Sequence, residues 1–146
     1  MRVFVDTNMF LRFFTDDDSG QSAKAEKLFH DAAKGKLRLV TGPPVLFEMA
    51  WTLKRSYGVA PDQILTLLEA VAAMPGLDLL DDVTVRLGLT LAREHHMDFA
   101  DAYIAATVQV ERLGALATFN ARHFRTLGMK LLPAGITGED EPLDGP

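Results

Sequence analysis

The chain has 146 residues, of which 48% are hydrophobic and 24% charged, a composition typical of a folded globular domain. It contains no cysteine, which excludes a disulfide framework, a thiolate zinc site and a cysteine nucleophile. The net charge of -5 argues against a broad basic platform for nucleic acid, although metal ions allow an acidic protein to act on a polyanion. No apolar run approaches the ~18 residues of a membrane span, and no signal-peptide core is visible, so a cytoplasmic protein is expected.

Short apolar runs alternate with helical patterns along the chain. In chain order, the pattern predicts a strand at 2–5, an apolar segment at 7–14, a helix at 21–33, a strand at 37–41, a helix at 45–57, a helix from 61 to a stop at 75–76, a strand at 77–80, a helix from 82 or 84 to 96, a helix from 98 to 112, and strands at 115–119 and 130–132. The remaining residues, 135–146, are rich in glycine, proline and acids and are expected to form a flexible tail. Alternating strands and helices predict an α/β fold with a parallel sheet covered by helices on its faces.

Ligand sites of such sheets lie at the carboxyl ends of the strands. Asp6 follows the first predicted strand, and Thr118, Phe119 and Asn120 end a later one. Each residue also has a simpler interpretation, since a lone Asp6 serves well as a helix N-cap and Asn120 is an ordinary turn residue.

Glu48 is the only charged residue between Leu39 and Leu53. Its helical neighbours are mostly apolar, and burying an unpaired carboxylate costs several kcal/mol, so we expect it to be neutral, paired or bound to metal. An ion pair with Arg12 is the alternative to a role in a site.

Asp101 is likewise the only charged residue between Phe99 and Val110, in a run of small apolar residues that predicts a buried helix. It falls in the first turn, where the helix dipole favours an ionised carboxylate. Asp98, three residues earlier, is expected to cap this helix.

Three acids on separate apolar elements are best explained together, because converging carboxylates repel one another unless a cation is present. Oxygen ligands select Mg²⁺ or Mn²⁺, and the spacing of the four histidines does not suit a metal site. A carboxylate-held Mg²⁺ activates water and neutralises phosphoryl oxygens, which indicates hydrolysis of a phosphodiester.

The same residues resemble the PIN-domain family, and within it the VapC-type toxins of toxin–antitoxin pairs. Four motifs appear in order: Val5-Asp6-Thr7-Asn8, Glu48 on the helix after the second strand, Asp101-Ala102-Tyr103-Ile104-Ala105-Ala106, and the segment 117–124 around Thr118-Phe119-Asn120. Each motif alone is weak, whereas four in order over the chain are fairly specific.

The resemblance implies a three-layer α/β/α sandwich with a central parallel sheet, formed by a single domain over residues 1–134. It implies a Mg²⁺- or Mn²⁺-dependent endoribonuclease, usually a homodimer, inhibited by a VapB-type antitoxin. The metal ligands would be Asp6, Glu48 and Asp101. Thr7 and Thr118 would orient ligands or water by hydrogen bonds, and Asn120 would take the fourth position. Apart from the resemblance, three basic residues are candidates for contacts with substrate phosphates: Arg12, Lys54 and Arg122.

One departure from the family pattern lies at the fourth position. Many members carry an aspartate at one of the two places held here by Asn120 and His123. Asp98 is the candidate to supply the missing charge, since it lies about one helical turn from Asp101. The missing acid argues against binding of a second metal ion more than against binding of the first.

Two other functions fit parts of the pattern. A degenerate domain would bind RNA or a protein partner without cutting. A phosphatase would use Asp6 as nucleophile, but that motif requires an aspartate where this chain has Asn8. Two dense groups of apolar residues, at 10–14 and at 64–68, are expected to belong mostly to the core, and any exposed part of them would provide a docking surface for an antitoxin helix.

Overall fold

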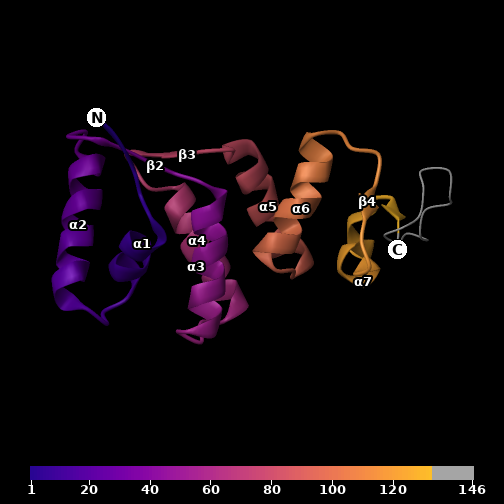
Figure 1. Ribbon diagram of the computed structural model, residues 1–146, viewed down its shortest axis with the longest axis horizontal. Helices are drawn as coiled ribbons and strands as arrows, with labels where there is room; N and C mark the ends of the chain where they lie inside the picture. Colours follow the sequence, from indigo (N-terminus) through magenta and orange to yellow (C-terminus); the bar gives the residue numbers. More distant parts are fainter. Residues whose placement is uncertain (133–146) are drawn as a thin grey trace. The chain divides into compact units, whose positions relative to one another are not determined.

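The computed structural model describes residues 1–132, which divide into two compact units, Met1–Asp82 and a second unit that begins at Val83 (Figure 1). The predicted tail at 135–146 lies outside the described residues. The first unit contains β1 (Arg2–Phe4), α1 (Thr7–Phe14), α2 (Ser19–Ala33), β2 (Arg38–Thr41), α3 (Pro43–Arg55), α4 (Pro61–Ala72) and β3 (Leu77–Leu79). The second contains α5 (Asp82–His95), α6 (Phe99–Val110), β4 (Leu116–Ala117), α7 (Ala121–Phe124), the 3-10 helix η1 (Arg125–Leu127) and β5 (Leu131–Leu132).

A parallel sheet with strand order β1-β2-β3 organises the first unit. Leu39 of β2 pairs with Val3 on one side and Leu77 on the other, and its side chain is fully buried. Because the strands are parallel, the carboxyl ends of β1 and β2 share one edge of the sheet. The turns that lead to α1 and α3 leave from this edge, which brings Asp6 and the start of α3 to the same place.

Helix α1 lies between α2 and α3 and packs on both (Figure 1). The ring of Phe10 stacks on Phe29 with centroids 5.3 Å apart, and Phe13 meets the same ring edge-on at 4.9 Å. These contacts hold an eight-residue helix that would be marginal alone. They also fix its first turn at the edge of the sheet.

Small residues let α5 and α6 approach closely in the second unit. Gly88 of α5 faces the backbone of Tyr103, and a Cβ placed on Gly88 would lie 3.3 Å from the Tyr103 Cα. Ala102 and Ala105 of α6 are fully buried. This packing fixes α6, whose first turn carries Asp101.

All the predicted strands form, and every pairing among residues 1–132 is parallel. They pair as a three-stranded and a two-stranded sheet, because β4 and β5 have only two residues each and pair only with one another. Two parts of the chain carry helices that the sequence did not predict. The apolar segment 7–14 is α1, and residues 121–127 form α7 and η1. No helix of residues 1–132 has the length and apolarity needed to cross a membrane.

Candidate active site

Thr7 links two of the predicted acids. Asp6 is the N-cap of α1, and its Oδ1 accepts a hydrogen bond from the backbone N–H of Thr7 at 2.7 Å. The Thr7 hydroxyl donates to Oε2 of Glu48 at 3.0 Å, across 41 residues of sequence. Thr7 itself is only 1% exposed. One buried residue therefore restrains both carboxylates at the carboxyl edge of the sheet.

The strand end before Asp6 is held from the neighbouring strand. The buried Thr41 side chain donates from Oγ1 to the carbonyl of Val5 at 3.0 Å. The Val5 N–H donates to the carbonyl of Val40 at 2.8 Å. The backbone that leads into Asp6 is thus fixed by both a side-chain and a main-chain hydrogen bond.

The structure corrects the expected burial of Glu48, whose side chain is exposed. Pro44 and Trp51, two of the helical neighbours that suggested an apolar setting, are exposed as well. The buried face of α3 runs instead through residues such as Met49 and Leu53. The argument from the cost of burial therefore does not apply, and the hydrogen bond from Thr7 becomes the evidence for a role of Glu48.

Arg12 is not the partner of Glu48. Its Nε donates to Oε1 of Gln21 at 2.6 Å, and its Nη1 lies 3.3 Å from Asp17 and from the Tyr57 hydroxyl. The Tyr57 hydroxyl also donates to Asp17 at 2.6 Å. This hydrogen bond is the main cause that lowers the pKa of Asp17, followed by one from Thr15 and by the charge of Arg12. Arg12 thus joins α1 to its neighbours, and its contact with phosphate stays a prediction.

Asp101 has a histidine as neighbour in the second unit. His123 Nδ1 lies 3.2 Å from Asp101 Oδ2, and the Asp101 side chain is 30% exposed. An ionised carboxylate only accepts hydrogen bonds, so His123 donates from Nδ1. No sequence pattern indicated this contact, because the two residues are 22 positions apart and lack metal-ligand spacing.

The expected cap by Asp98 is only half right. Asp98 occupies the N-cap position of α6, but its side chain makes no capping hydrogen bond. In the loop after β4, the Thr118 hydroxyl accepts from the backbone N–H of Asn120 at 2.9 Å. Asn120 is exposed and is the N-cap of α7, again without a side-chain cap.

The donor chemistry of Asp6 and Glu48 suits a hard cation such as Mg²⁺, because both offer carboxylate oxygens that neutral N–H or O–H donors orient. Within residues 1–132 the structure brings these two acids to a common partner. It forms no cluster of three or more His, Asp or Glu side chains that would hold a metal. The three-carboxylate ligand set stays a prediction.

Comparison with known proteins identifies the family. The PIN domain model matches residues 3–128, most of the chain. The chain belongs to the PIN domain family. The α/β fold with a parallel sheet that the sequence predicted is thereby confirmed as a PIN fold.

The PIN domain is also similar to the crystal structure of Mycobacterium tuberculosis VapC20, described as a toxin that cleaves the Sarcin-Ricin loop. The identity is 18% and the TM-score 0.39, over 87% of this chain and 95% of VapC20. No curated protein matches the chain.

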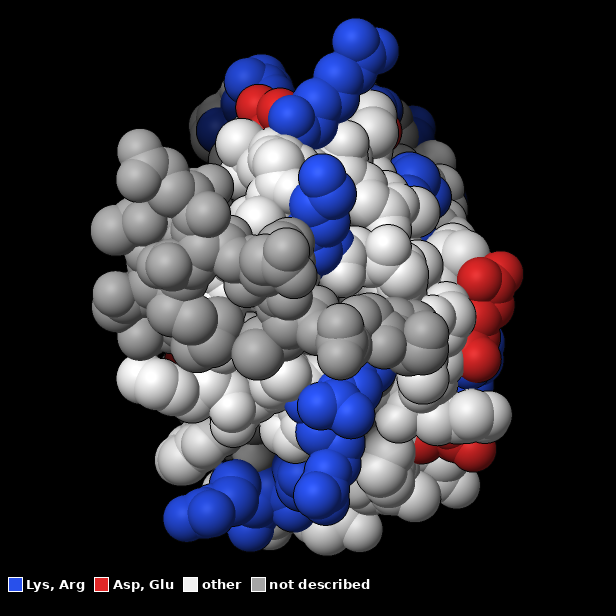
Figure 2. Space-filling view, turned by 90° about the vertical axis from the view of Figure 1, so that its right-hand side faces the viewer, with Lys and Arg blue, Asp and Glu red and all other residues white. Residues whose placement is uncertain are grey.

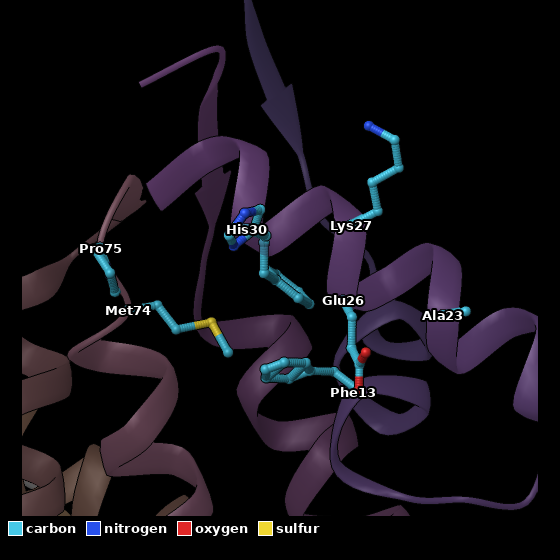
Figure 3. Close-up of a pocket in the computed structure, with 8 residues that line it drawn as sticks. Phe13, Ala23, Glu26, Lys27, His30, Met74 and Pro75 are labelled. Carbon is cyan, nitrogen blue, oxygen red and sulfur yellow. The ribbon is translucent and has the colours of Figure 1, made fainter. Parts of the chain in front are cut away.

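The first unit of this PIN domain has an apolar hollow of about 720 Å³. Phe13, Met74 and Pro75 line it, and Figure 3 shows the side chains of Met74 and Phe13 directed toward one another, with Lys27 pointing away. The aliphatic residues of α4, which were also candidates for a docking surface, belong mainly to the core, since Ile64 is 7% exposed. Phe13 therefore offers accessible apolar surface, whereas the apolar side of α4 does not.

Proposed function

We propose that this PIN domain is a Mg²⁺- or Mn²⁺-dependent endoribonuclease, the toxin of a VapBC-type pair. The observation that carries the proposal is the pair of carboxylates, Asp6 and Glu48, that share Thr7 at the carboxyl edge of the sheet. Neither acid makes an ion pair with a described Lys or Arg. The cap that Asp6 places on α1 uses one oxygen and a neutral donor, so the negative charges of Asp6 and Glu48 remain available to ligate a cation.

In this proposal Asp6, Glu48 and Asp101 ligate the metal, as the motif resemblance implies. When bound, a divalent ion lowers the pKa of a ligated water and neutralises charge on a phosphoryl oxygen. Thr7 positions Glu48 through its hydroxyl, and His123 positions Asp101 through its ring Nδ1. The attacked group is a phosphodiester of single-stranded RNA.

The remaining site residues are assigned supporting roles. Thr118 and Asn120 orient ligands or water at the fourth position, with Asp98 as the acid nearest in sequence to Asp101. Asp98 lacks a capping hydrogen bond, which leaves its carboxylate available for that role. Arg122 contacts phosphates of the substrate, since it is exposed and makes no ion pair within residues 1–132.

The protein partner in this proposal is a VapB-type antitoxin, and the protein itself is a homodimer. The hollow at Phe13, Met74 and Pro75 supports a partner that inserts apolar side chains, because the hollow exposes aromatic and thioether surface. The motif resemblance of residues 5–124 supports the toxin assignment.

Cleavage of a mixed RNA pool by purified protein tests the function. With Mg²⁺ or Mn²⁺ the wild type is expected to cut, and EDTA or Asp6→Asn is expected to abolish cutting. Asp16→Asn is the matched control, since it removes an exposed carboxylate ten positions away. Unchanged cutting by a folded Asp6→Asn variant would refute the assignment of Asp6.

A binding module without cleavage is the rival function, supported by the lack of an acid at positions 120 and 123. Metal-dependent stability separates the two. A ligand that binds only the native state raises the melting temperature, so Mn²⁺ is expected to stabilise the wild type and not Asp6→Asn. A protein that neither cuts nor responds to Mn²⁺ would favour the binding module. Hydrolysis of a phosphomonoester in place of RNA would favour the phosphatase.

A further inference from the structure

Phe119 is the most exposed phenylalanine of the described chain. Its side chain is 82% exposed, in the loop between β4 and α7. Phe124, five positions later, is 3% exposed and belongs to the core of the same unit. The loop therefore holds one aromatic ring in and presents the other to solvent, where it gains nothing from burial.

The exposed ring borders a hollow of about 460 Å³ in the second unit. The lining residues are Phe119, Asn120, Ala121, Arg122, His123 and Arg125. Apart from the aromatic ring, the wall consists mainly of groups that donate hydrogen bonds, among them two guanidinium groups. This volume suits a compact ligand, since pockets for small molecules occupy about 300–1,000 Å³.

The hollow lies in a positively charged stretch of an acidic protein. No aspartate or glutamate occurs between Glu111 and Glu139, whereas the basic residues of that stretch are Arg112, Arg122, Arg125 and Lys130. Both lining arginines are exposed, and neither makes an ion pair within residues 1–132. On the face shown in Figure 2, Lys and Arg side chains are more prominent than acidic ones. Unpaired guanidinium groups beside an exposed ring suit a ligand that is both anionic and flat.

We propose that this hollow is a binding subsite for single-stranded RNA, in which an unpaired base stacks on Phe119 and Arg122 and Arg125 hold the flanking phosphates. Proteins that bind single strands combine an aromatic platform with a basic groove, and every base offers a face for stacking. Base-paired RNA keeps its bases stacked within the helix, so Phe119 selects unpaired nucleotides.

The subsite adjoins Asp101, one of the proposed metal ligands, through His123. This histidine lines the hollow and also donates to Asp101. A nucleotide stacked on Phe119 therefore has its phosphates close to the Asp101 side of the site. The inference rests on the proposed nuclease function and adds the residues that choose its substrate.

Binding measured in EDTA tests the subsite separately from cleavage. The probe is a fluorescein-labelled single-stranded RNA of about 12 nucleotides, within the length that such sites cover. Phe119→Ala is expected to weaken binding by about 5- to 140-fold, the range for loss of one stacked base. Phe119→Trp is expected to retain binding. Leu113→Ala is the control, because Leu113 is another apolar residue of this unit that is 54% exposed. The Leu113→Ala variant is expected to bind RNA as tightly as the wild type.

Three further measurements separate stacking from charge. Arg122→Gln is expected to weaken the binding of all RNA sequences alike and to reduce the steepness of log affinity against log salt concentration by about 1. An abasic RNA of the same length keeps the phosphates, so it is expected to bind the wild type as weakly as normal RNA binds Phe119→Ala. The chain has a single tryptophan, Trp51, so Phe119→Trp in a Trp51→Phe background gives a fluorescence signal that base stacking is expected to quench.

Equal affinity of Phe119→Ala and wild type, or equal binding of abasic and normal RNA, would overturn the subsite. So would a loss of dimers in Phe119→Ala with RNA binding intact, because the ring would then belong to a contact between two copies. If the wild type cuts no RNA but Phe119→Ala weakens RNA binding, the subsite is supported and the proposed nuclease function is refuted. If the wild type cuts RNA but Phe119→Ala binds RNA as the wild type does, the nuclease function is supported and the subsite is refuted.

Discussion

Thr7→Val removes the hydroxyl that joins α1 to Glu48 and leaves the volume of the side chain almost unchanged. The lost hydrogen bond has its acceptor on an exposed carboxylate, so water can replace the threonine. We therefore expect a small loss of stability, about 0.5–1.5 kcal/mol. For a chain of this length that corresponds to a fall of about 2–4 °C in melting temperature per kcal/mol.

The same change is expected to act strongly on metal binding. Removing a group that orients a metal ligand costs about 10- to 100-fold in affinity, and Thr7 is such a group for Glu48 in the proposed site. Titration of Mn²⁺ by calorimetry measures this loss directly. Thr7→Ser keeps the hydroxyl and is expected to restore the affinity.

Thr41→Val is the comparison, since Thr41 is also a buried threonine but donates to the backbone carbonyl of Val5. The main-chain hydrogen bond from Val5 to Val40 remains and still holds the backbone before Asp6. Val5 is 1% exposed, so the substitution leaves a buried carbonyl without this donor, at a cost of about 1–3 kcal/mol. Thr41→Val should therefore be the less stable of the two variants, and Thr7→Val should bind Mn²⁺ more weakly. Wild-type affinity for Mn²⁺ in Thr7→Val would refute the role given to the hydroxyl.

Two further predictions concern stability. Gly76→Ala should destabilise far more than Gly35→Ala, because both glycines have φ of +80° but only at Gly76 would the Cβ lie 2.6 Å from the Ala32 carbonyl carbon. Chemical denaturation should show about 1–2 kcal/mol of backbone strain in both variants and an added clash in Gly76→Ala. Tyr57→Phe should raise the pKa of Asp17, because the tyrosine hydroxyl is the main group that lowers it. A carboxyl whose pKa is lowered in the folded state stabilises the protein above the unfolded value of 3.8, and this stabilisation is lost as the pH falls. The stabilities of the two proteins should therefore differ at neutral pH and converge in acid. An NMR titration of the Asp17 carboxyl checks the shift.

The strands could be predicted from short apolar runs, and the long helices from apolar residues that repeat with a helical period. Helix α1 was not predicted, although its apolar side chains gather on one face, because eight residues are too few to display a helical period. Its aromatic rings pack on α2, as in the contact of Phe10 with Phe29. Helix α7 has four residues, which is too short for any period to show.

The structure supports one of the arguments that picked out the candidate site and corrects another. Asp6 was picked out because it follows the first strand, and the parallel sheet does bring that strand end to the edge where ligands bind. The strand itself is less buried than its apolar run suggested, since Phe4 is 56% exposed. Glu48 was found through its apolar neighbours, but Pro44 and Trp51 are exposed, so apolar residue type was a poor guide to burial here. The contact of His123 with Asp101 depends on how α7 packs on α6, which no local pattern encodes.

Acids with a structural role form a separate group in this chain. Their partners are cationic: Arg38 and Asp78 join β2 to β3 at 2.6 Å, and Lys27 pairs with Asp31 along α2 at 2.7 Å. The charge and hydrogen bonds of Arg38 lower the pKa of Asp78, with a smaller part from Arg2. These pairs neutralise their own charge and lie on exposed surface, where they add little to stability.

The proposed ligands follow a different rule. In each, one oxygen accepts a hydrogen bond: Asp6 Oδ1 and Glu48 Oε2 from Thr7, and Asp101 Oδ2 from His123. Within residues 1–132, none of the three carboxylates is paired with Lys or Arg. One oriented oxygen fixes the carboxyl group, while the second oxygen and the negative charge remain available to a cation. A structural ion pair would use up that charge, so this arrangement supports metal ligation over a role in folding.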